Sequence, residues 1–425
     1  MSLLACITNG IIGKRQKNRL SHNRFIISKP MASDIDISKI KQPLRFLHLS
    51  VDEKFFDTVT SNYEKKEWTN NKYLIVKESA KAEIKYVKKR EKIDILYSKT
   101  SIKRRLQKDD YDILLVHSLN PLYMPYLQYI PNNKIVIWWV WGFDIYDSIY
   151  GMRPLIDIPL YQNHTQHFIH NSKILLLKKI VRVVFFKRRY EKYRTDFMHR
   201  ADYIQPVLTE EYTILKNKYG IKAKEYYPYS ESAKYSYNFS TTPPPDGNIL
   251  IGNSASFHNN HIDIWNAAKN LISEDRNIIV PLNYAGPADY ADSVAKKITA
   301  DHHRTTILRD FINKNEYYSI IDTCSYAIFG SLRQQAMANI RYCLRNRIKV
   351  FLYKDSIVYK HLTAFGYKVF AIEDIDNNSF STPLSENDHR ANAEAYKKEI
   401  NHKKEKALTV LKLMLTDSAE NHSKN

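Results

Sequence analysis

An alternation of short apolar runs with longer, polar, periodic segments constrains the fold more than any other feature of the sequence. The apolar runs of the first part of the chain are residues 44–49, 72–76, 93–97, 113–116 and 135–140, followed by 201–207. Short apolar runs that alternate with helical segments are typical of buried parallel strands joined by helices. None of the runs approaches the roughly 20 apolar residues that a membrane-spanning helix needs. The first part therefore predicts one parallel sheet, with a helix over 210–219 that ends at Gly220.

The same alternation restarts after residues 240–247, which read Ser-Thr-Thr-Pro-Pro-Pro-Asp-Gly and form the only proline-dense stretch of the chain. Such a stretch is typical of a linker between domains, and a loop inside one domain is the alternative. The strands expected beyond it are residues 248–251, 277–281, 305–308, 326–329, 349–352 and 368–370. The expected helices are residues 260–272, 288–298 and 335–345, with two more that begin near residues 316 and 356. We therefore predict an α/β protein whose two doubly wound parallel sheets enclose a cleft, since ligands of such sheets bind beyond the carboxyl ends of the strands.

This pattern divides the chain into five parts. They are a basic leader (1–40), a first domain (41–239), a linker (240–247), a second domain (248–384) and a C-terminal helix with a tail (385–425). We expect the leader to be disordered; because its first 33 residues hold six Lys or Arg and no acidic residue, a transit-like peptide is the alternative. The C-terminal helix is polar and is expected to cross back over the first domain.

The composition narrows the choice of partners. The chain has 65 Lys and Arg against 45 Asp and Glu, a formal net charge of +20, which favours nucleic acid, anionic lipid or phosphorylated substrates. Its ten Gly form neither a dinucleotide-binding fingerprint nor a P-loop, which excludes both motifs. The three Cys, at positions 6, 324 and 343, are too few and too scattered for a disulfide framework or a Cys-based zinc site. We expect a reducing compartment, no cofactor and no metal.

The first candidate site lies in an aromatic run that ends the strand over residues 135–140. This strand would deliver Trp141 and then Asp144 to the carboxyl edge of the first sheet. A carboxylate among aromatic rings is desolvated, so its pKa should rise toward the range that suits a general base. The alternative is that Asp144 caps the following helix and the tryptophans belong to the core.

His117 and Asn120 follow the strand over residues 113–116 and should reach the same edge. Either side chain can hydrogen bond to a sugar hydroxyl, and His117 is the second candidate for the base. A structural histidine is the alternative.

In the second domain, polar residues stand where strands give way to helices. Gly252, Asn253 and Ser254 follow the first strand, and Asn260 opens the next helix, so amides and a hydroxyl converge near the positive end of that helix. This arrangement suits a diphosphate. An N-cap role for Asn260 is compatible with such binding.

Two further junctions of the second domain add a cation and a ring. Arg333 stands just before a helix, where its guanidinium can grip a phosphate with two parallel hydrogen bonds. A surface Arg paired with an acid is the alternative. Tyr284 supplies a ring that can stack on a base or contact the phosphates. Asn313 and Glu316 fit a capping box, so we expect a structural role for Glu316.

Residues 173–194 carry nine Lys or Arg, one Glu and a large share of apolar side chains. A basic segment with this apolar content fits peripheral attachment to an anionic membrane surface. A helix buried along one side and solvated on the other is the alternative.

Taken in order, these motifs resemble a known family over roughly residues 110–355. They are His117 with Asn120-Pro121, Trp141-Gly-Phe-Asp144-Ile-Tyr146, Gly151 with Arg153, Gly252-Asn-Ser254 with Asn260-His261, Pro281 with Tyr284, and Arg333-Gln334-Gln335. The family is that of the TDP-N-acetylfucosamine:lipid II N-acetylfucosaminyltransferases, glycosyltransferase family 56. The chain departs from the family at Ala336 and Ala338, where glycine is expected, and at Arg345-Asn-Arg347, which lacks the glycine usual before the next strand.

The resemblance implies a GT-B fold, in which two Rossmann-like domains face each other across a cleft. It also implies an inverting, metal-independent transfer of a deoxyamino sugar, such as N-acetylfucosamine from its dTDP donor, onto a polyprenyl-diphosphate-linked acceptor at the cytoplasmic face of the bacterial inner membrane. The first domain would bind the acceptor through Asn120, Trp141 and Arg153. The second would hold the nucleotide-sugar through Gly252, Asn253, Ser254, Asn260, Tyr284, Arg333, Gln334 and Gln335.

Two rival interpretations remain at this point. One is another GT-B enzyme of capsule or O-antigen synthesis that uses a different donor. The other is a nucleic-acid-binding protein, because the net charge and the 31 Tyr also fit a nucleic-acid surface. We expect that nucleic acid is not a partner.

Overall fold

The computed structural model describes residues 24–26, 43–53, 56–88, 91–147, 152–170, 188–228, 238–240, 242, 244, 247–310 and 312–423. Most of the basic leader lies outside these residues. The same holds for Gly151 and for the part of the basic segment 173–194 that precedes residue 188.

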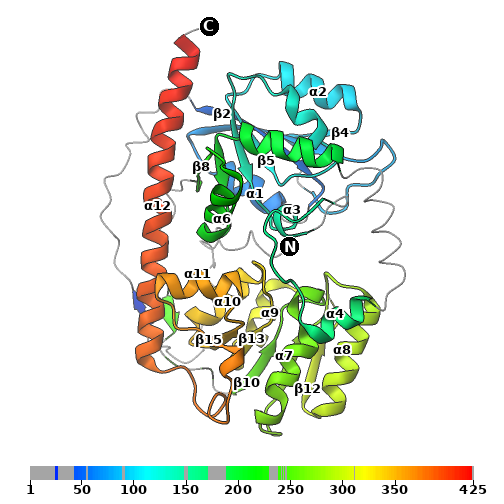
Figure 1. Cartoon of the computed structure of the whole chain (residues 1–425). Coiled ribbons are helices and arrows are strands. Elements are labelled where there is room, and N and C mark those ends of the chain that lie inside the picture. The colour runs from blue at the N-terminus through cyan, green and yellow to red at the C-terminus, as the bar shows by residue number, and fades with distance from the viewer. Residues whose placement is uncertain are drawn as a thin grey trace.

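The chain forms two lobes, one above the other in Figure 1. The first lobe is built on a seven-stranded, wholly parallel sheet with the strand order β4-β3-β2-β5-β6-β7-β8. Its strands are β2 (Leu44–Val51), β3 (Thr69–Val76), β4 (Ile93–Leu96), β5 (Ile113–His117), β6 (Ile135–Trp139), β7 (Tyr203–Gln205) and β8 (Lys224–Glu225). Its helices include α1 (Phe56–Tyr63), α2 (Lys99–Lys108), the 3-10 helix η3 (Met124–Tyr129), α3 (Phe143–Tyr146) and α6 (Thr209–Tyr219), together with helical residues 188–200.

The second lobe is built on a six-stranded parallel sheet with the strand order β12-β11-β10-β13-β14-β15. Its strands are β10 (Asn248–Ile251), β11 (Ile278–Pro281), β12 (Thr305–Leu308), β13 (Cys324–Phe329), β14 (Lys349–Leu352) and β15 (Phe370–Ala371). Its helices include η5 (Phe257–Asn259), α7 (His261–Ala268), η6 (Lys269–Leu271), α8 (Ala288–Asp301), α9 (Lys314–Ile321), α10 (Met337–Arg345), α11 (Ile357–Phe365) and η7 (Ile372–Asp374). The predicted α/β class with two parallel sheets is confirmed.

Local signals set several helix ends as the sequence predicts. Gly220 ends α6 in a left-handed conformation with φ of 61°. The Asn313 side chain caps α9 by accepting from the backbone N–H groups of Asn315 and Glu316, at 3.1 and 3.0 Å. Asn313 also donates to the Glu316 carboxylate at 3.1 Å, so Glu316 has the structural role expected of it.

Three short strands were not predicted. β8 consists of Lys224 and Glu225, which carry no apolar signal. β1 (Arg24–Ile26), inside the range predicted to be disordered, pairs antiparallel with β9 (Asn238–Ser240). Each of these strands is defined by its backbone hydrogen bonds to a neighbouring strand of the same chain, and the local sequence does not reveal that pairing.

The segment around α4 (Asn163–His170) falls within residues 41–239 but packs on the second lobe, beside α7 in Figure 1. Asp263 of α7 accepts from the backbone N–H groups of His164 and Thr165, at 2.8 and 3.1 Å, and from the Thr165 hydroxyl at 2.7 Å. The ring of Phe168 contacts that of Tyr290, with centroids 5.3 Å apart. The chain therefore packs against the second lobe at α4, returns to the first lobe, and enters the second lobe again at β10.

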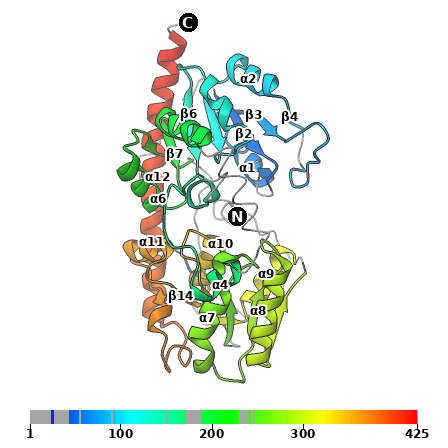
Figure 2. The same cartoon turned by 45° about the vertical axis from the view of Figure 1, so that its right-hand side comes forward.

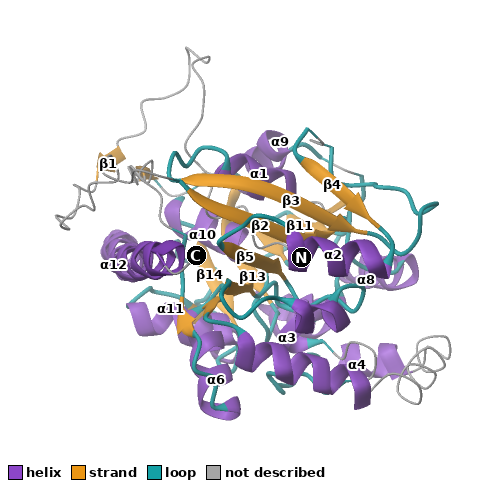
Figure 3. Cartoon of the chain, turned by 90° about the horizontal axis from the view of Figure 1, so that it is seen from above, coloured by secondary structure: helices purple, strands orange, loops and turns teal. Residues whose placement is uncertain are grey.

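The helix α12 (Glu386–Ser423) runs along both lobes in Figures 1 and 2, and stands at the side of the two sheets when seen from above in Figure 3. Near its start, Ala393 and Tyr396 are buried against the second lobe. Further along, Leu408 and Met414 join the apolar cluster under the first sheet. This polar helix therefore ties the two lobes together.

Candidate active site at the facing edges of the two sheets

Asp144 follows β6 and is buried in the first lobe, with its carboxylate fully occupied by protein donors. One oxygen accepts from the Leu119 backbone at 3.1 Å and from the Trp138 indole at 2.9 Å, and the other accepts from the Trp141 backbone at 3.0 Å. Burial raises the pKa of Asp144 to about 6, although these hydrogen bonds work in the opposite direction. The raised pKa fits the expectation for a base, but the three donors indicate a carboxylate that holds the loops after β5 and β6 together.

His117 is the last residue of β5 and is fully buried. Its Nε2 lies 3.0 Å from Nδ1 of His48, while its Nδ1 finds no hydrogen-bond partner among the described residues. The rings of Phe56, Trp139 and Trp141 surround it, with centroids between 5.2 and 5.8 Å away. Burial lowers the pKa of His117 well below its ordinary value, so the imidazole is neutral near pH 7.

The other predicted acceptor residues of the first lobe differ in their surroundings. The indole N–H of Trp141 is buried and finds no partner in the described chain. Asn120 accepts from the Leu122 backbone at 3.0 Å, which stabilises its turn. Arg153 is exposed. Ser118, which sequence reasoning missed, has a buried hydroxyl without a described partner and a strained, left-handed backbone with φ of 68°.

In the second lobe, Gly252 directly follows β10 at a position that requires glycine. Its φ is +69°, and a Cβ there would lie 2.7 Å from Nε2 of His261. The next residue, Asn253, donates to the Tyr284 hydroxyl at 3.2 Å and accepts from the Gln335 side chain at 3.2 Å. Three of the predicted donor residues, from the loops after β10, β11 and β13, are therefore linked by hydrogen bonds.

Asn259 and Asn260 are adjacent but differ in what their amides contact. Asn259 donates to the carbonyl of Ser254 at 2.8 Å, and its own Oδ1 finds no described partner. Asn260 accepts from the Gln162 backbone at 2.8 Å and donates to the Gly330 carbonyl at 2.7 Å. It stands at the N-cap position of α7 without a side-chain cap bond. Its amide joins the crossing segment to the second lobe, so Asn260 as a donor contact stays a prediction that this geometry does not favour.

Arg333 lies in the loop after β13, is buried, and faces the first lobe. Its Nη1 is 3.9 Å from Oδ1 of Asp147, and Nε2 of His258 is 3.7 Å from the same oxygen. The Tyr161 hydroxyl lies 3.3 Å from His258. Asp147 therefore lies near the Arg333 guanidinium and the His258 imidazole of the other lobe, and burial lowers the pKa of that imidazole well below its ordinary value. Its place three residues after Asp144 gave no reason to expect these contacts.

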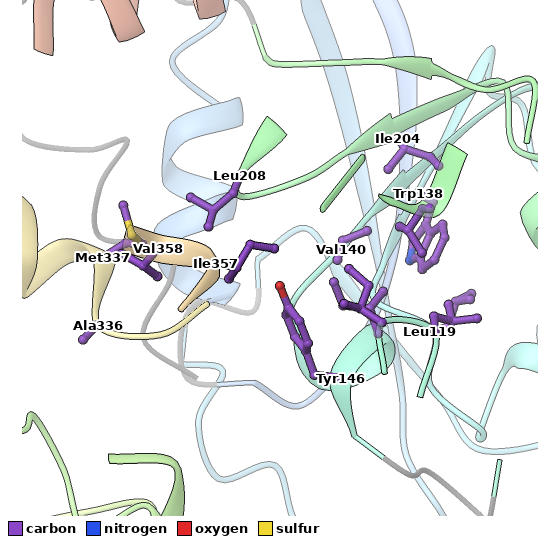
Figure 4. Packing of buried hydrophobic residues seen from close by; sticks show 14 of the residues in the cluster. Leu119, Trp138, Val140, Tyr146, Ile204, Leu208, Ala336, Met337, Ile357 and Val358 are labelled. Carbon is purple, nitrogen blue, oxygen red and sulfur yellow. The ribbon is translucent and has the colours of Figure 1, made fainter. Parts of the chain in front are cut away.

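Apolar packing brings the two lobes together beside this ion pair. Tyr146 and Leu208 of the first lobe belong to the same buried cluster as Met337, Ile357 and Val358 of the second, as Figure 4 shows. The carboxyl edges of the two sheets are therefore in contact through both polar and apolar side chains.

Of the 21 buried side-chain polar atoms without a hydrogen-bond partner in the described chain, ten belong to residues at these two edges. We call the following atoms the edge groups: Nδ1 of His117, the Ser118 hydroxyl, the Trp141 indole N–H, Oδ1 of Asn259, Nε2 of His261, Oδ1 of Asn283, Nε of Arg333, both amide atoms of Gln334, and Oε1 of Gln335. Proteins pair the large majority of their buried polar atoms, so such a gathering indicates a site that binds a polar ligand. Asn283 was missed, although its neighbour Tyr284 was predicted.

Backbone strain follows the same pattern. Among the described residues, the non-glycine residues with positive φ are Ser118, Asn260, Ala285, Ala336 and Arg347. The first four lie in loops that follow β5, β10, β11 and β13. Strained conformations of this kind concentrate at functional sites.

Within the described part of the chain, no group of three or more His, Cys, Asp or Glu side chains is arranged to hold a metal ion. None of the described helices combines the length and the apolar character needed to cross a membrane.

Comparisons with known proteins agree with this architecture. Residues 212–388 match the family described as 4-alpha-L-fucosyltransferase, glycosyl transferase group 56. No curated protein matches the chain in sequence. Among solved structures, a glycosyltransferase from Rickettsia africae is similar with a TM-score of 0.56 and 12% identity, over 89% of this chain and 99% of that one. The lipopolysaccharide outer core galactosyltransferase WaaB is similar with a TM-score of 0.53 and 11% identity, over 84% of this chain and 98% of that one.

A third similar structure is the alpha,alpha-trehalose 6-phosphate synthase of Burkholderia multivorans, with a TM-score of 0.53 and 9% identity, over 90% of this chain and 98% of that one. At these identities the structural neighbours establish the fold, which is the predicted GT-B type. The family match covers most of the second lobe, which carries the residues predicted to bind the donor. The chain is therefore a glycosyltransferase of the GT-B type that resembles glycosyltransferase family 56.

Proposed function

We propose that the chain is an inverting, metal-independent glycosyltransferase that moves a deoxyamino sugar from a nucleoside diphosphate onto a lipid-linked saccharide. The observation that carries this proposal is the set of edge groups, which belong to residues at and beyond the carboxyl ends of strands in both lobes. The first lobe contributes a neutral imidazole with an unpartnered nitrogen. The second contributes a guanidinium and amides, which suit a diphosphate.

On the acceptor side we propose His117, rather than Asp144, as the general base. Nδ1 of His117 has no described partner, whereas both oxygens of Asp144 already accept hydrogen bonds from the protein. A base must reach the proton that it takes, so the unpartnered nitrogen is better suited. Trp141, with its unpartnered indole N–H, would hold the acceptor sugar beside it, and Asn120 and Arg153 would line the approach.

On the donor side we propose that Arg333 stabilises the negative charge that builds on the departing diphosphate. A buried guanidinium can do this without a metal ion, because it supplies positive charge and two parallel donors in a site of low dielectric. The amides of Gln334 and Gln335 would contact the donor nearby, with Tyr284 beside them. Gly252, Asn253, Ser254 and Asn260 would shape the loop that surrounds it.

The finer specificity rests on the family resemblance. We propose dTDP-N-acetylfucosamine or a related dTDP-sugar as donor and a polyprenyl-diphosphate-linked saccharide as acceptor, reached at the inner face of a bacterial membrane. The basic segment 173–194 would contact the anionic surface. A GT-B enzyme of capsule or O-antigen synthesis with another donor is the second candidate, because Ala336 and Ala338 stand near the donor loop where the family has glycine.

A thermal-shift panel of nucleoside diphosphates tests the donor. A ligand that binds only the folded state raises its stability by RT ln(1 + [L]/Kd), about 2.7 kcal/mol at 100 times Kd. We expect dTDP to raise the melting temperature more than UDP, GDP or CMP. Preference for another nucleotide would support the second candidate, and no response to any of them would contradict a nucleotide-sugar enzyme.

Variants separate the two sides of the site. Arg333→Ala should weaken dTDP binding, while Arg104→Ala, an exposed arginine of α2, should leave it unchanged. His117→Ala should reduce transfer by roughly 100-fold or more and leave dTDP binding intact. Wild-type turnover in His117→Ala would remove His117 from the mechanism and return the base assignment to Asp144.

A further inference from the structure

A row of four polar side chains crosses the first sheet from β3 through β2 to β5. The row runs from Thr69 and Asn71 on β3 to His48 on β2 and then to His117 at the end of β5. These strands are neighbours in the sheet. Asn71, His48 and His117 are all buried, so solvent does not compete for their hydrogen bonds.

The direction of the hydrogen bonds can be worked out from the Thr69 end. The Thr69 hydroxyl has a single hydrogen, which it donates to the backbone carbonyl of Tyr63 or Lys66, each 3.1 Å away. Its oxygen therefore accepts from Nδ2 of Asn71 at 2.9 Å. This contact fixes the orientation of the Asn71 amide and turns Oδ1 toward His48.

Oδ1 of Asn71 is only an acceptor, so Nε2 of His48, 3.2 Å away, must carry a proton. Burial lowers the pKa of His48 to about 3, so the ring is neutral near pH 7 and has only one N–H. Because that proton is on Nε2, Nδ1 is unprotonated and can only accept a hydrogen bond. Nε2 of His117 lies 3.0 Å from Nδ1 of His48, so Nε2 must carry the single proton of the neutral His117 ring. By elimination, Nδ1 of His117 presents a lone pair, and it is the nitrogen without a described partner.

We propose that Thr69, Asn71 and His48 act as positioning residues that hold His117 in the Nε2–H tautomer, so that its Nδ1 is always ready to accept a proton from a sugar hydroxyl. This inference rests on the proposed function, in which His117 is the base. In that step the hydroxyl oxygen forms the bond to the anomeric carbon, and the bond from that carbon to the diphosphate oxygen breaks with its electron pair leaving on the diphosphate. The hydroxyl proton passes to Nδ1.

The other tautomer would be inactive, because it would place an N–H where the acceptor hydroxyl has to donate. Without Nδ1 of His48 as a hydrogen-bond acceptor, no contact in the row would favour one tautomer of His117 over the other. His48 therefore controls the fraction of enzyme that is competent, without touching the substrate.

Two substitutions at His48 separate this role from packing. His48→Phe keeps a ring against Tyr63 and Tyr73, whose centroids are each 4.6 Å from that of His48, but removes the acceptor. His48→Gln keeps an amide that can accept from His117 and donate to Asn71. We expect His48→Phe to lower kcat roughly 10-fold or more, with an altered pH profile and an unchanged KM for the donor. His48→Gln should recover most of the activity.

Nitrogen-15 NMR of the imidazole rings in the wild-type protein tests the tautomer without any activity. We expect His117 to carry its proton on Nε2 alone, and the exposed His199 to show the exchange between tautomers of an ordinary histidine. A proton on Nδ1 of His117, or a His48→Phe enzyme with wild-type kcat and pH profile, would overturn the proposal. If instead the tautomer is as expected but His117→Ala is fully active, the row exists and the base assignment fails.

Discussion

Two buried polar clusters differ in how the groups at their centres are paired. One is centred on Glu399 of α12, and we call it the strap cluster. It comprises Glu399 and Lys403 of α12, Arg341 of α10, His361 of α11 and Tyr367, with Glu210 of α6 at its margin. The other is the set of edge groups at the carboxyl ends of the strands.

In the strap cluster the Glu399 carboxylate is completely buried and lies among cations. One oxygen is 3.2 Å from His361 and 2.8 Å from Lys403 and is also paired with Arg341, while the Tyr367 hydroxyl donates to the other at 2.8 Å. His361 reaches across to Glu210 of the first lobe at 2.6 Å. The central carboxylate is paired on both sides, which is the arrangement of a cluster that holds a structure together.

At the sheet edges, by contrast, buried atoms are left without protein partners and several backbones are strained. An unpaired buried polar group costs about 1–3 kcal/mol, so these atoms weaken the folded state. Burial alone therefore does not distinguish a structural polar group from one that binds a ligand. The pairing of each atom does, and it can be tested by substitution.

The greatest loss of stability should follow a substitution in the strap cluster. Glu399→Gln removes a buried carboxylate and leaves Arg341, Lys403 and His361 without their common partner. We expect the free energy of unfolding to fall by about 3–5 kcal/mol, measured by urea denaturation. The control is Glu386→Gln at the start of the same helix, where the carboxylate pairs with Arg390 in solvent and contributes less than about 1 kcal/mol. Equal losses in the two variants would mean that the strap cluster contributes no more than a surface pair.

A smaller loss is expected at Asp144, the fully paired carboxylate of the first edge. Asp144→Asn turns an amide N–H toward backbone and indole donors, so we expect a loss of about 2 kcal/mol in the free energy of unfolding. Asp147→Asn, at a half-exposed carboxylate three residues away, should cost less than about 1 kcal/mol. If Asp144→Asn is as stable as the wild type yet inactive, Asp144 is the base and its hydrogen bonds do not give it a structural role.

The strap cluster also predicts a pH window. Burial opposes the charged form of His361, but Glu210 and Glu399 raise its pKa, so the stability that it contributes is present below about pH 6.5 and is lost as the pH rises through the folded-state pKa. Burial alone would raise the pKa of Glu399, yet its cationic neighbours hold it well below the ordinary value. Its contribution is present above about pH 4.3 and is lost as the pH falls through the folded-state value.

Both contributions are therefore complete between about pH 4.3 and 6.5. Urea midpoints across pH 4 to 9 should fall on the alkaline side, and His361→Gln should flatten that side only. An alkaline slope that survives in His361→Gln would assign it to other groups.

The comparison predicts an effect of opposite sign at an edge group. Both amide atoms of the Gln334 side chain are buried without a described partner, so Gln334→Met should raise the free energy of unfolding by about 1 kcal/mol. The same substitution should weaken dTDP binding. Gln128→Met, at an exposed amide of the first lobe, should change neither quantity. A destabilised Gln334→Met protein would show that this amide is paired in solution.

Much of the fold followed from the sequence, because strands buried on both faces must be apolar runs. The strands that were missed have a different origin: Lys224 and Glu225 of β8 are charged and extend the sheet only because β7 offers an open edge. The early visit of α4 to the second lobe was also missed. It depends on Asp263, about 100 residues further along, and no local pattern reports such a contact.

The candidate site also has features that the sequence predicted and features that it did not. The ends of predicted strands brought His117, Arg333 and Gln335 to the two facing edges, which is a consequence of parallel topology. The pairing of Asp144 with Leu119 could not be predicted, and neither could that of His48 with His117, 69 residues away. Sequence reasoning places a side chain at an edge, but whether its polar atoms are already taken depends on neighbours from other strands.

Ala336 carries the smallest predicted effect, and it is an effect of strain. It ends the loop after β13 at the N-cap of α10 with φ of 58° and ψ of 15°, at a position where the family resemblance leads us to expect glycine. A left-handed conformation costs a residue with a Cβ roughly 1–2 kcal/mol. The substitution Ala336→Gly would remove this cost. The gain is partly offset, because glycine is more flexible in the unfolded chain and the buried methyl group is lost. Ala336→Gly should therefore raise the free energy of unfolding by about 1 kcal/mol or less.

Ala338, two residues further along, provides the matched control because it is already inside α10, where glycine lowers stability by about 0.5–1 kcal/mol. The same chemical change should therefore have opposite signs at the two positions in parallel urea titrations. Equal losses of unfolding free energy in the two variants would mean that residue 336 leaves the left-handed conformation in solution. The backbone strain of the facing edges would then not include the loop after β13. If the signs do differ, the loop that carries Arg333 is held in a conformation that its own sequence disfavours, which is expected of a segment kept in place to meet a ligand.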